Sequence, residues 1–189
     1  MTVQINYKKS GLQKPSNNLV LFVDGKFNTK YIKNHVSLEE LSYISDLLKI
    51  SDLDKNLLVF ELSSKKKIIL ISIKKNVKNS DIENLGAEFY RCINYGKNSE
   101  YFINSDSIIG KYENFISYFL HGLKLKSYEF NKYKSKKKTR IISINVSGNK
   151  NKISVQNQLK FKALEEGTFL ARDLVSEPGN ILHPDEYAK

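Results

Sequence analysis

The sequence predicts an α/β fold in which helices flank a mixed β-sheet, followed by a long connecting helix. Three observations lead to this prediction. Short apolar runs alternate with segments of helical periodicity over residues 1–150. Two of these runs are separated by a short polar stretch, which is typical of a hairpin, so the sheet is mixed. Of the 189 residues, 40% are hydrophobic, which is enough to bury a core and excludes a disordered chain.

The predicted strands are short apolar runs bounded by polar or turn residues. Asn18–Val23 is apolar after its first residue and is closed by Asp24-Gly25, a turn pair. Leu57–Leu62 and Lys67–Ile73 form the predicted hairpin, and the second of these runs is rich in β-branched residues. Thr139–Val146 is the last predicted strand.

Three helices are predicted between and after these strands. Ser37 is a favourable N-cap, and Glu40 three residues later completes a capping box. The same spacing recurs at Ser80 and Glu83, which predicts the start of a second helix. A third helix is predicted over Lys111–Lys124, where aromatic and aliphatic residues recur with helical spacing.

One long helix is predicted from Val155 to Val175. Small and apolar residues form a stripe along it that needs a covering partner: Ala163, Leu164, Gly167, Leu170, Ala171, Leu174 and Val175. The helix ends before Pro178, because proline lacks an amide hydrogen and disfavours helix in the residue that precedes it. We therefore expect a domain over residues 1–150, a connecting helix over 151–177 and a new segment over 178–189.

Cysteine usage and hydropathy exclude several classes of protein. Cys92 is the single cysteine, which excludes a disulfide framework and a multi-cysteine metal site. Its place on an apolar helical stripe predicts a packed core thiol. No apolar run approaches the length of a membrane span, and the polar N-terminus lacks the apolar core of a secretory signal. We therefore expect a cytoplasmic protein without membrane contact.

A basic stretch gives the chain one candidate binding surface. The net charge is +11, and eight basic residues lie between Lys124 and Arg140 against Glu129 alone. Aromatic residues interleave with the lysines, as they do on surfaces that bind nucleic acid. The candidate nucleic-acid-binding residues are Lys132, Lys134, Lys136, Lys137, Lys138 and Arg140.

Two other interpretations of this basic stretch remain open. It is also consistent with a solvated loop whose lysines protect an edge strand from pairing with other chains, and we favour this interpretation. The high lysine and asparagine content is also typical of a coding bias. Only three of the 31 basic residues are arginine, the residue best suited to bidentate phosphate contacts. Any DNA binding is therefore expected to be weak, independent of sequence and sensitive to salt.

A search for catalytic motifs finds none. The sequence has no HExxH, GxSxG or CxxC motif and no Gly-rich phosphate loop. Its three histidines, His35, His121 and His183, are far apart. His121 is predicted near a helix end, where a cation interacts favourably with the helix dipole. We expect no catalytic residue, no metal ligand and no cofactor in this chain.

Two stretches of the chain nevertheless resemble a known family. The later one contains Arg172-Asp173-Leu174-Val175, and the earlier one runs from Gly122 to Lys134. Both are similar to the leucyl (cytosol) aminopeptidase family, whose junction between two domains reads approximately E-G-x-x-x-A-R-D-L-V-N-x-P-x-N-x-L-x-P. The chain departs from the family at Ser176, where Asn is usual, at His183, where Thr is usual, and at Tyr187, where Leu is usual. The matching residues of the junction motif include Arg172, Asp173, Leu174, Pro178, Asn180 and Pro184.

The resemblance implies a macro-like N-terminal domain that the long helix joins to a catalytic domain, of which residues 178–189 would be the start. In this family the catalytic residues and two divalent metal ions, manganese or zinc, lie in that catalytic domain. The chain alone is therefore expected to be inactive. The whole enzyme would be a cytoplasmic homo-hexamer that removes N-terminal amino acids from peptides in intracellular protein turnover, and this domain would serve assembly or access control.

Two alternatives stand beside this interpretation. The first is a nucleic-acid-binding module that uses the Lys124–Arg140 stretch. The second is a nucleotide-binding domain of the macro type, which the sequence disfavours because a Gly-rich phosphate loop at a strand end is not found.

Overall fold

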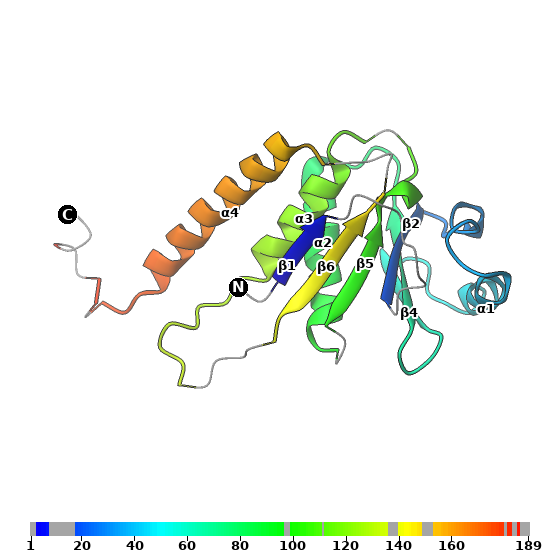
Figure 1. Cartoon of the computed structure of the whole chain (residues 1–189), viewed down its shortest axis with the longest axis horizontal. Coiled ribbons are helices and arrows are strands. Elements are labelled where there is room, and N and C mark those ends of the chain that lie inside the picture. The colour runs from blue at the N-terminus through cyan, green and yellow to red at the C-terminus, as the bar shows by residue number, and fades with distance from the viewer. Residues whose placement is uncertain are drawn as a thin grey trace.

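The computed structural model describes residues 3–7, 18–96, 99–110, 112–135, 140–148, 153–179, 181–182 and 185. Over these residues the chain forms one six-stranded sheet and four α-helices, with 3-10 turns at Thr29–Tyr31 and Ser105–Ser107 (Figure 1). The strands are β1 (Val3–Tyr7), β2 (Asn18–Asp24), β3 (Leu57–Glu61), β4 (Lys67–Ile73), β5 (Glu100–Asn104) and β6 (Ile142–Ser147). The helices are α1 (Leu38–Leu48), α2 (Asn79–Asn94), α3 (Phe115–Lys126) and α4 (Val155–Ser176).

The sheet has the strand order β1-β6-β5-β2-β4-β3. Its neighbouring strands are parallel except β3 and β4, which pair antiparallel with Leu58 opposite Leu70. The predictions of a mixed sheet and of this hairpin are therefore confirmed. The apolar runs do not predict β1 (VQINY) or β5 (EYFIN), because both strands are short and carry polar residues. Each strand forms through its parallel pairing with β6.

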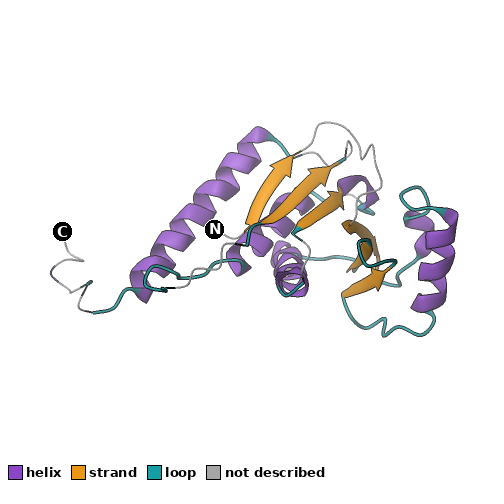
Figure 2. Ribbon diagram, turned by 60° about the horizontal axis from the view of Figure 1, so that its bottom comes forward, coloured by secondary structure: helices purple, strands orange, loops and turns teal. Residues whose placement is uncertain are grey.

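Alternate residues of the central strand β2 point to opposite faces of the sheet. Val20 and Phe22 belong to the core that α2 and α3 cover. Leu19, Leu21 and Val23 belong to the core that α1 covers. Figure 2 shows the helices on both sides of the strands. A strand that is covered on both faces has no solvent-facing position, which explains why β2 is an unbroken apolar run.

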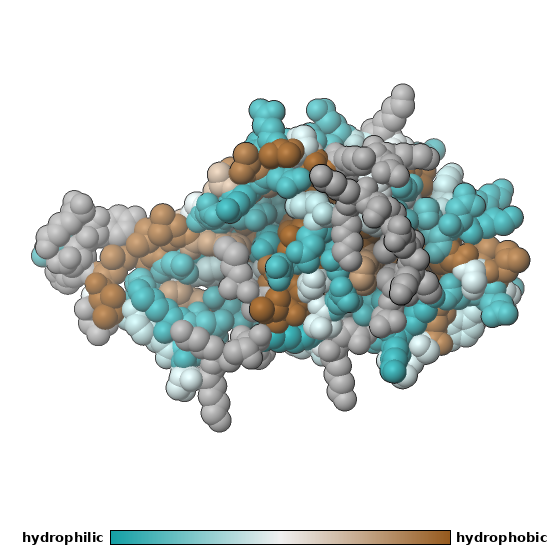
Figure 3. Space-filling view, viewed as in Figure 1, coloured by the Kyte–Doolittle hydropathy of each residue, from teal (hydrophilic) through white to brown (hydrophobic). Residues whose placement is uncertain are grey.

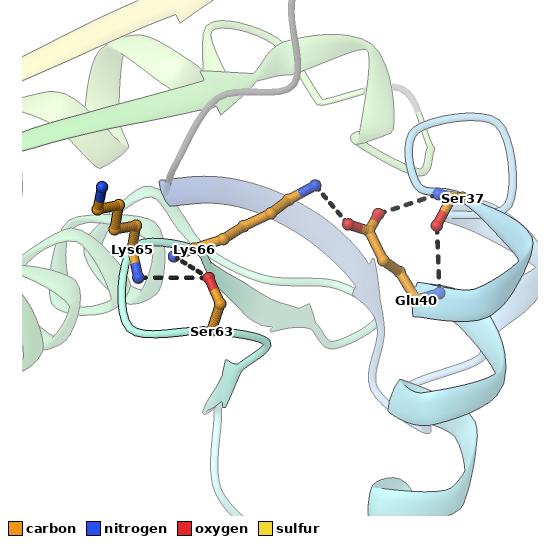
Figure 4. Close-up of polar contacts among 5 residues, drawn as sticks. All are labelled: Ser37, Glu40, Ser63, Lys65 and Lys66. Atoms are coloured by element: carbon orange, nitrogen blue, oxygen red, sulfur yellow. Dashed lines mark hydrogen bonds and ion pairs between the residues drawn. The ribbon is translucent and has the colours of Figure 1, made fainter.

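Helix α1 begins where its capping box predicts. The Ser37 hydroxyl accepts a hydrogen bond from the Glu40 amide at 3.2 Å, and the Glu40 carboxylate accepts one from the Ser37 amide at 3.0 Å. The same carboxylate forms an ion pair with Lys66, just after the β3–β4 turn (Figure 4). Burial raises the pKa of Glu40, but hydrogen bonds from Lys66 and Ser37 outweigh it and hold this pKa below its usual value. One side chain thus caps α1 and ties it to the hairpin.

Helices α2 and α3 cross with their backbones almost in contact. A Cβ atom at Gly86 would lie 1.9 Å from the carbonyl oxygen of Phe119. A Cβ atom at Gly122 would lie 1.9 Å from the carbonyl oxygen of Glu83. Both distances are far below van der Waals contact, and in each case the obstacle is backbone rather than a flexible side chain. The crossing therefore requires glycine at both positions.

The predicted start of α2 is wrong by two residues, which is about half a helical turn. The helix begins at Asn79 with Lys78 as the N-cap residue. The Lys78 amide donates to the Asp81 carboxylate at 2.9 Å, and this bond satisfies a donor at the helix start. Ser80 therefore lies in the first turn rather than at the cap.

Two predictions about single residues are also wrong. Cys92 is exposed on α2 rather than packed in the core, because Ile93 takes the inward position at that turn. His121 does not lie at a helix end, because α3 continues to Lys126. His121 instead lies in the middle of the helix and is buried, with 8% of its surface exposed.

Candidate functional site

The segment that follows α3 folds back onto the end of α4. We call residues Tyr128–Tyr133 the strap. The Tyr128 hydroxyl donates a hydrogen bond to the Asp173 carboxylate at 2.7 Å. The Lys132 ammonium lies 2.5 Å from the Glu177 carboxylate, which also accepts a hydrogen bond from the Tyr133 hydroxyl. The strap thus holds the last turn of α4 at two points.

Arg172 of α4 makes a further contact with the end of α3. Its guanidinium donates to the carbonyl oxygen of Leu125 at 2.6 Å and lies 5.5 Å from the centre of the Tyr128 ring. The Phe169 ring, one turn earlier and buried, lies 5.3 Å from the same tyrosine ring. Arg172 and Asp173 of the junction motif therefore have a structural role in this chain, because they anchor α4 to the strap and to α3.

The remaining residues of the junction motif do not anchor α4 in the way that Arg172 and Asp173 do. Leu174 is half-buried, and Pro178 is exposed just after the helix end. Asn180 and Pro184 lie outside the described residues. Glu177 follows the last residue of α4 and contacts the strap. The hydrogen bond from Lys132 lowers the pKa of its carboxyl group most, and the hydrogen bond from Tyr133 lowers it further.

The predicted nucleic-acid residues do not form one free basic surface among the described residues. Lys132 is in the ion pair with Glu177. Arg140 donates to the carbonyl oxygens of Asn94 and Ile93 at the end of α2, at 2.7 and 3.4 Å. Lys134 is exposed. The other three predicted residues, Lys136, Lys137 and Lys138, lie outside the described part of the chain. The interleaved aromatic residues Tyr128 and Tyr133 face α4 as parts of the strap.

Helix α4 leaves most of its predicted apolar stripe exposed. Phe161 and Phe169 are its buried residues, and both lie on the side that faces α3 and the strap. On the other side, Leu164 is 48%, Leu170 is 61% and Val175 is 88% exposed. A Cβ atom at Gly167 would meet nothing within 4 Å. Figure 3 shows hydrophobic surface along the position of α4. The stripe therefore remains without cover from the described residues.

Two further searches bear on function. Among the described residues, no three His, Cys, Asp or Glu side chains lie close enough together to hold a metal ion. These residues therefore do not fit a two-metal centre, which needs several carboxylates around ions about 3.5–4 Å apart. Within the same residues, no helix combines the length and the hydropathy that a bilayer crossing needs.

Comparison with curated proteins gives a consistent result. The chain is 35% identical over 134 residues to a probable cytosol aminopeptidase of Clostridium perfringens. This match covers 65% of the chain and 27% of the relative's length. A probable cytosol aminopeptidase of a Bradyrhizobium species is 38% identical over 72 residues, which cover 36% of the chain and 14% of that protein. The chain thus spans only a minor part of these relatives. No family model matches it.

Solved structures share the fold. A mutant of tomato leucine aminopeptidase superposes with a TM-score of 0.69 at 18% identity, over 97% of this chain and 40% of that one. The bottromycin maturation enzyme BotP, in complex with Mn, superposes with a TM-score of 0.62 at 13% identity, over 92% and 34% of the two chains. The alternating α/β order, the junction motif, the curated relatives and this fold agree. The chain is therefore similar to members of the leucyl (cytosol) aminopeptidase family, over a region that corresponds to their N-terminal domain.

Proposed function

We propose that the chain is the non-catalytic N-terminal domain of a leucyl aminopeptidase-like enzyme, and that α4 docks it to a catalytic domain. In this proposal residues 1–150 form the domain, residues 151–177 form the connecting helix, and residues 178–189 begin the catalytic part. The enzyme would remove N-terminal amino acids from peptides in the cytoplasm. The domain would serve assembly or access control in a homo-hexamer.

The exposed stripe of α4 is the observation that carries this proposal. Its leucine and valine side chains lie opposite the face that packs on α3, and exposed apolar surface of this kind is typical of interaction sites. The small residues of the stripe, such as Gly167, would let another backbone approach closely. The curated relatives, which are several times longer than the matched region, would supply the partner surface.

The chemistry would reside in the catalytic partner. A pair of divalent metal ions, manganese or zinc, would activate water and polarise the peptide carbonyl there. The described residues of this chain do not provide a site for such ions, so no step of the reaction is assigned to them. Purified chain with manganese is expected to give no turnover of leucine p-nitroanilide. Turnover that a chelator abolishes would contradict the proposal that this chain is non-catalytic.

The docking surface is tested by adding a catalytic partner in trans. The remainder of the Clostridium perfringens relative, produced separately, is mixed with this chain, and association is measured by light scattering after gel filtration. We expect a complex with the native chain and none with Leu170→Glu, which places a charge in the apolar stripe. Leu38→Glu on α1 is the matched control, because Leu38 is 75% exposed on a different helix. A complex that survives Leu170→Glu would overturn the docking role of α4.

A further inference from the structure

Helices α3 and α4 enclose a pocket at the edge of the sheet. Its volume is about 310 Å³, and its walls come from β1, from α3 and from the first half of α4. This size is at the lower end of ligand pockets, which range from about 300 to 1,000 Å³. The pocket therefore suits a small molecule. It is separate from the strap and from the exposed stripe of α4.

The pocket has an apolar floor. Leu120 and Phe161 line it and are 3% and 8% exposed, and Ile5 and Ile153 complete the apolar part of the lining. The Phe161 ring is fixed in place by Tyr118 and His121, whose ring centres each lie 5.1 Å away. Such a floor favours a ligand with an aliphatic group.

Polar groups of both charges stand around this floor. The His121 Nδ1 atom lies 3.3 Å from one carboxylate oxygen of Glu165, across the gap between α3 and α4. The Lys124 ammonium donates to the carbonyl oxygen of Val3 at 2.6 Å, which leaves two of its three protons for other acceptors. Burial, reinforced by Glu165, raises the pKa of Tyr7 to about 12, so its hydroxyl stays a donor at neutral pH.

One buried group in the pocket has no partner. Ser117 is 4% exposed, and among the described residues nothing forms a hydrogen bond with its hydroxyl. A buried polar group normally has a hydrogen-bond partner, since leaving it unpaired costs about 1–3 kcal/mol. Ser117 lines the pocket, so a ligand there could supply the missing bond.

The charge balance narrows the ligand class. Two lysines, Lys124 and Lys162, and two glutamates, Glu165 and Glu166, line the pocket, so the lining has no formal excess of either sign while the whole chain carries +11. A phosphate-bearing ligand needs an excess of cations, and a metal ion needs an excess of anions. Lys124 stands on α3 and Glu165 on α4, so the two helices present groups of opposite charge, which suits a molecule that carries both charges.

We propose that this pocket binds a free amino acid with an aliphatic side chain. The ligand ammonium would lie at the Glu165 carboxylate, and its carboxylate would lie toward Lys124 and the Tyr7 hydroxyl. The side chain would rest on Leu120 and Phe161, and Ser117 would complete its hydrogen bonding. This inference does not depend on the docking function, because every residue involved belongs to this chain.

Analogues of leucine that lack one charge test the proposal. Leucine, leucinamide, N-acetyl-leucine and glycine are each titrated into the purified chain to millimolar concentration, and backbone amide shifts are followed by NMR. We expect saturable shifts in α3 and α4 with leucine and weaker ones with glycine. Leucinamide lacks the carboxylate and N-acetyl-leucine lacks the ammonium, so neither should saturate. Equal binding of either analogue, or no saturable shift with leucine, would overturn the proposal.

Two variants with the same change of charge locate the ammonium site. Glu165→Gln is expected to weaken leucine binding by about tenfold or more, because a charge-assisted hydrogen bond becomes a neutral one. Glu39→Gln is the control: this carboxylate is exposed on α1 and does not line the pocket. Circular dichroism checks that both variants fold. Equal leucine affinity of Glu165→Gln and the native chain would reject the assigned site.

Discussion

Helix α3 has two helical neighbours, and the two interfaces are built in opposite ways. Against α2 its backbone makes a close approach at Gly86 and Gly122, where a Cβ atom would meet backbone, and the Phe89 and Phe119 rings also pack together between the two helices. Against α4 it packs through a few rings and polar pairs, and a pocket of about 310 Å³ remains between the helices. Close-packed interiors resist any change of volume. The comparison indicates that the position of α2 depends on the absence of side chains at two glycines. The position of α4 depends on contacts from a small number of side chains.

The largest expected effect comes from a methyl group at the tight crossing. Gly122→Ala should destabilise the fold by more than about 3 kcal/mol, because the new Cβ atom would meet backbone that has no room to move. Gly167→Ala on α4 is the matched control and should be neutral or stabilising by up to about 1 kcal/mol, since alanine favours helix and the space there is open. Urea unfolding measures both. Similar free energies of unfolding for the two variants would break the comparison.

A second variant tests how α4 is attached. Phe161→Ala removes the main ring contact between α4 and α3 and should cost about 3 kcal/mol, at the lower end for a buried aromatic side chain, because the site already borders a pocket. We expect faster amide hydrogen exchange in the first half of α4 with unchanged protection in α2 and α3. Loss of protection in all three helices together would show that α4 is an integral part of the core.

The capping box of α1, on the opposite face of the sheet, should give an effect of intermediate size on the free energy of unfolding. Ser37→Ala should cost about 1 kcal/mol, the usual value for loss of a side-chain N-cap. Ser80→Ala, in the first turn of α2 rather than at its cap, should change the free energy of unfolding by less than about 0.5 kcal/mol. Thermal unfolding of the two variants separates these outcomes, and a cost at Ser80 as large as that at Ser37 would contradict the observed start of α2.

The smallest expected effect is a loosening of the α4 end in acid. Hydrogen bonds from Lys132 and Tyr133 hold the pKa of Glu177 below the unfolded value of about 4.3. The ionised form is therefore favoured by folding, and this contribution is present above pH of about 4.3 and disappears as the pH falls through the lower folded value. Amide chemical shifts of residues 170–179 should report the change before those of α2 and α3.

Glu177→Gln provides the control for this acid transition. Glutamine does not titrate, so the shifts of residues 170–179 should no longer move in this pH range. A transition that persists in this variant would assign the loosening to another carboxylate.

The parts of the fold that the sequence predicts are those with a local cause. The apolar run of β2, the β3–β4 hairpin, the Ser37 capping box and the α4 span each follow from neighbouring residues, and each is observed. Strands β1 and β5 depend on pairing with β6, which no local pattern reveals. Cys92 shows the limit of periodicity, because two adjacent apolar residues competed for one inward position and Ile93 took it.

In the candidate sites, too, features with a local cause are visible in the sequence, and contacts between distant residues are not. The stripe of α4 is visible in the sequence, and the structure leaves much of it exposed. The pairing of Lys132 with Glu177 joins residues 45 positions apart, so the basic stretch and the junction motif look unrelated until the chain folds. The contact between His121 and Glu165 spans 44 positions, which is why neither residue could be assigned to a pocket from its neighbours.

The position of β1 at the edge of the sheet has a consequence for biosynthesis. Among the described strands, the first pairs with the last, since Val3 lies opposite Ile142 and Tyr7 opposite Val146. During translation β1 leaves the ribosome well before β6, its pairing partner among the described strands, has been made. Contacts so distant in sequence form late, because a long loop must close before they contribute. The nascent chain must therefore keep β1 unpaired while the four strands between β1 and β6 are made, and the described sheet is completed by its earliest strand.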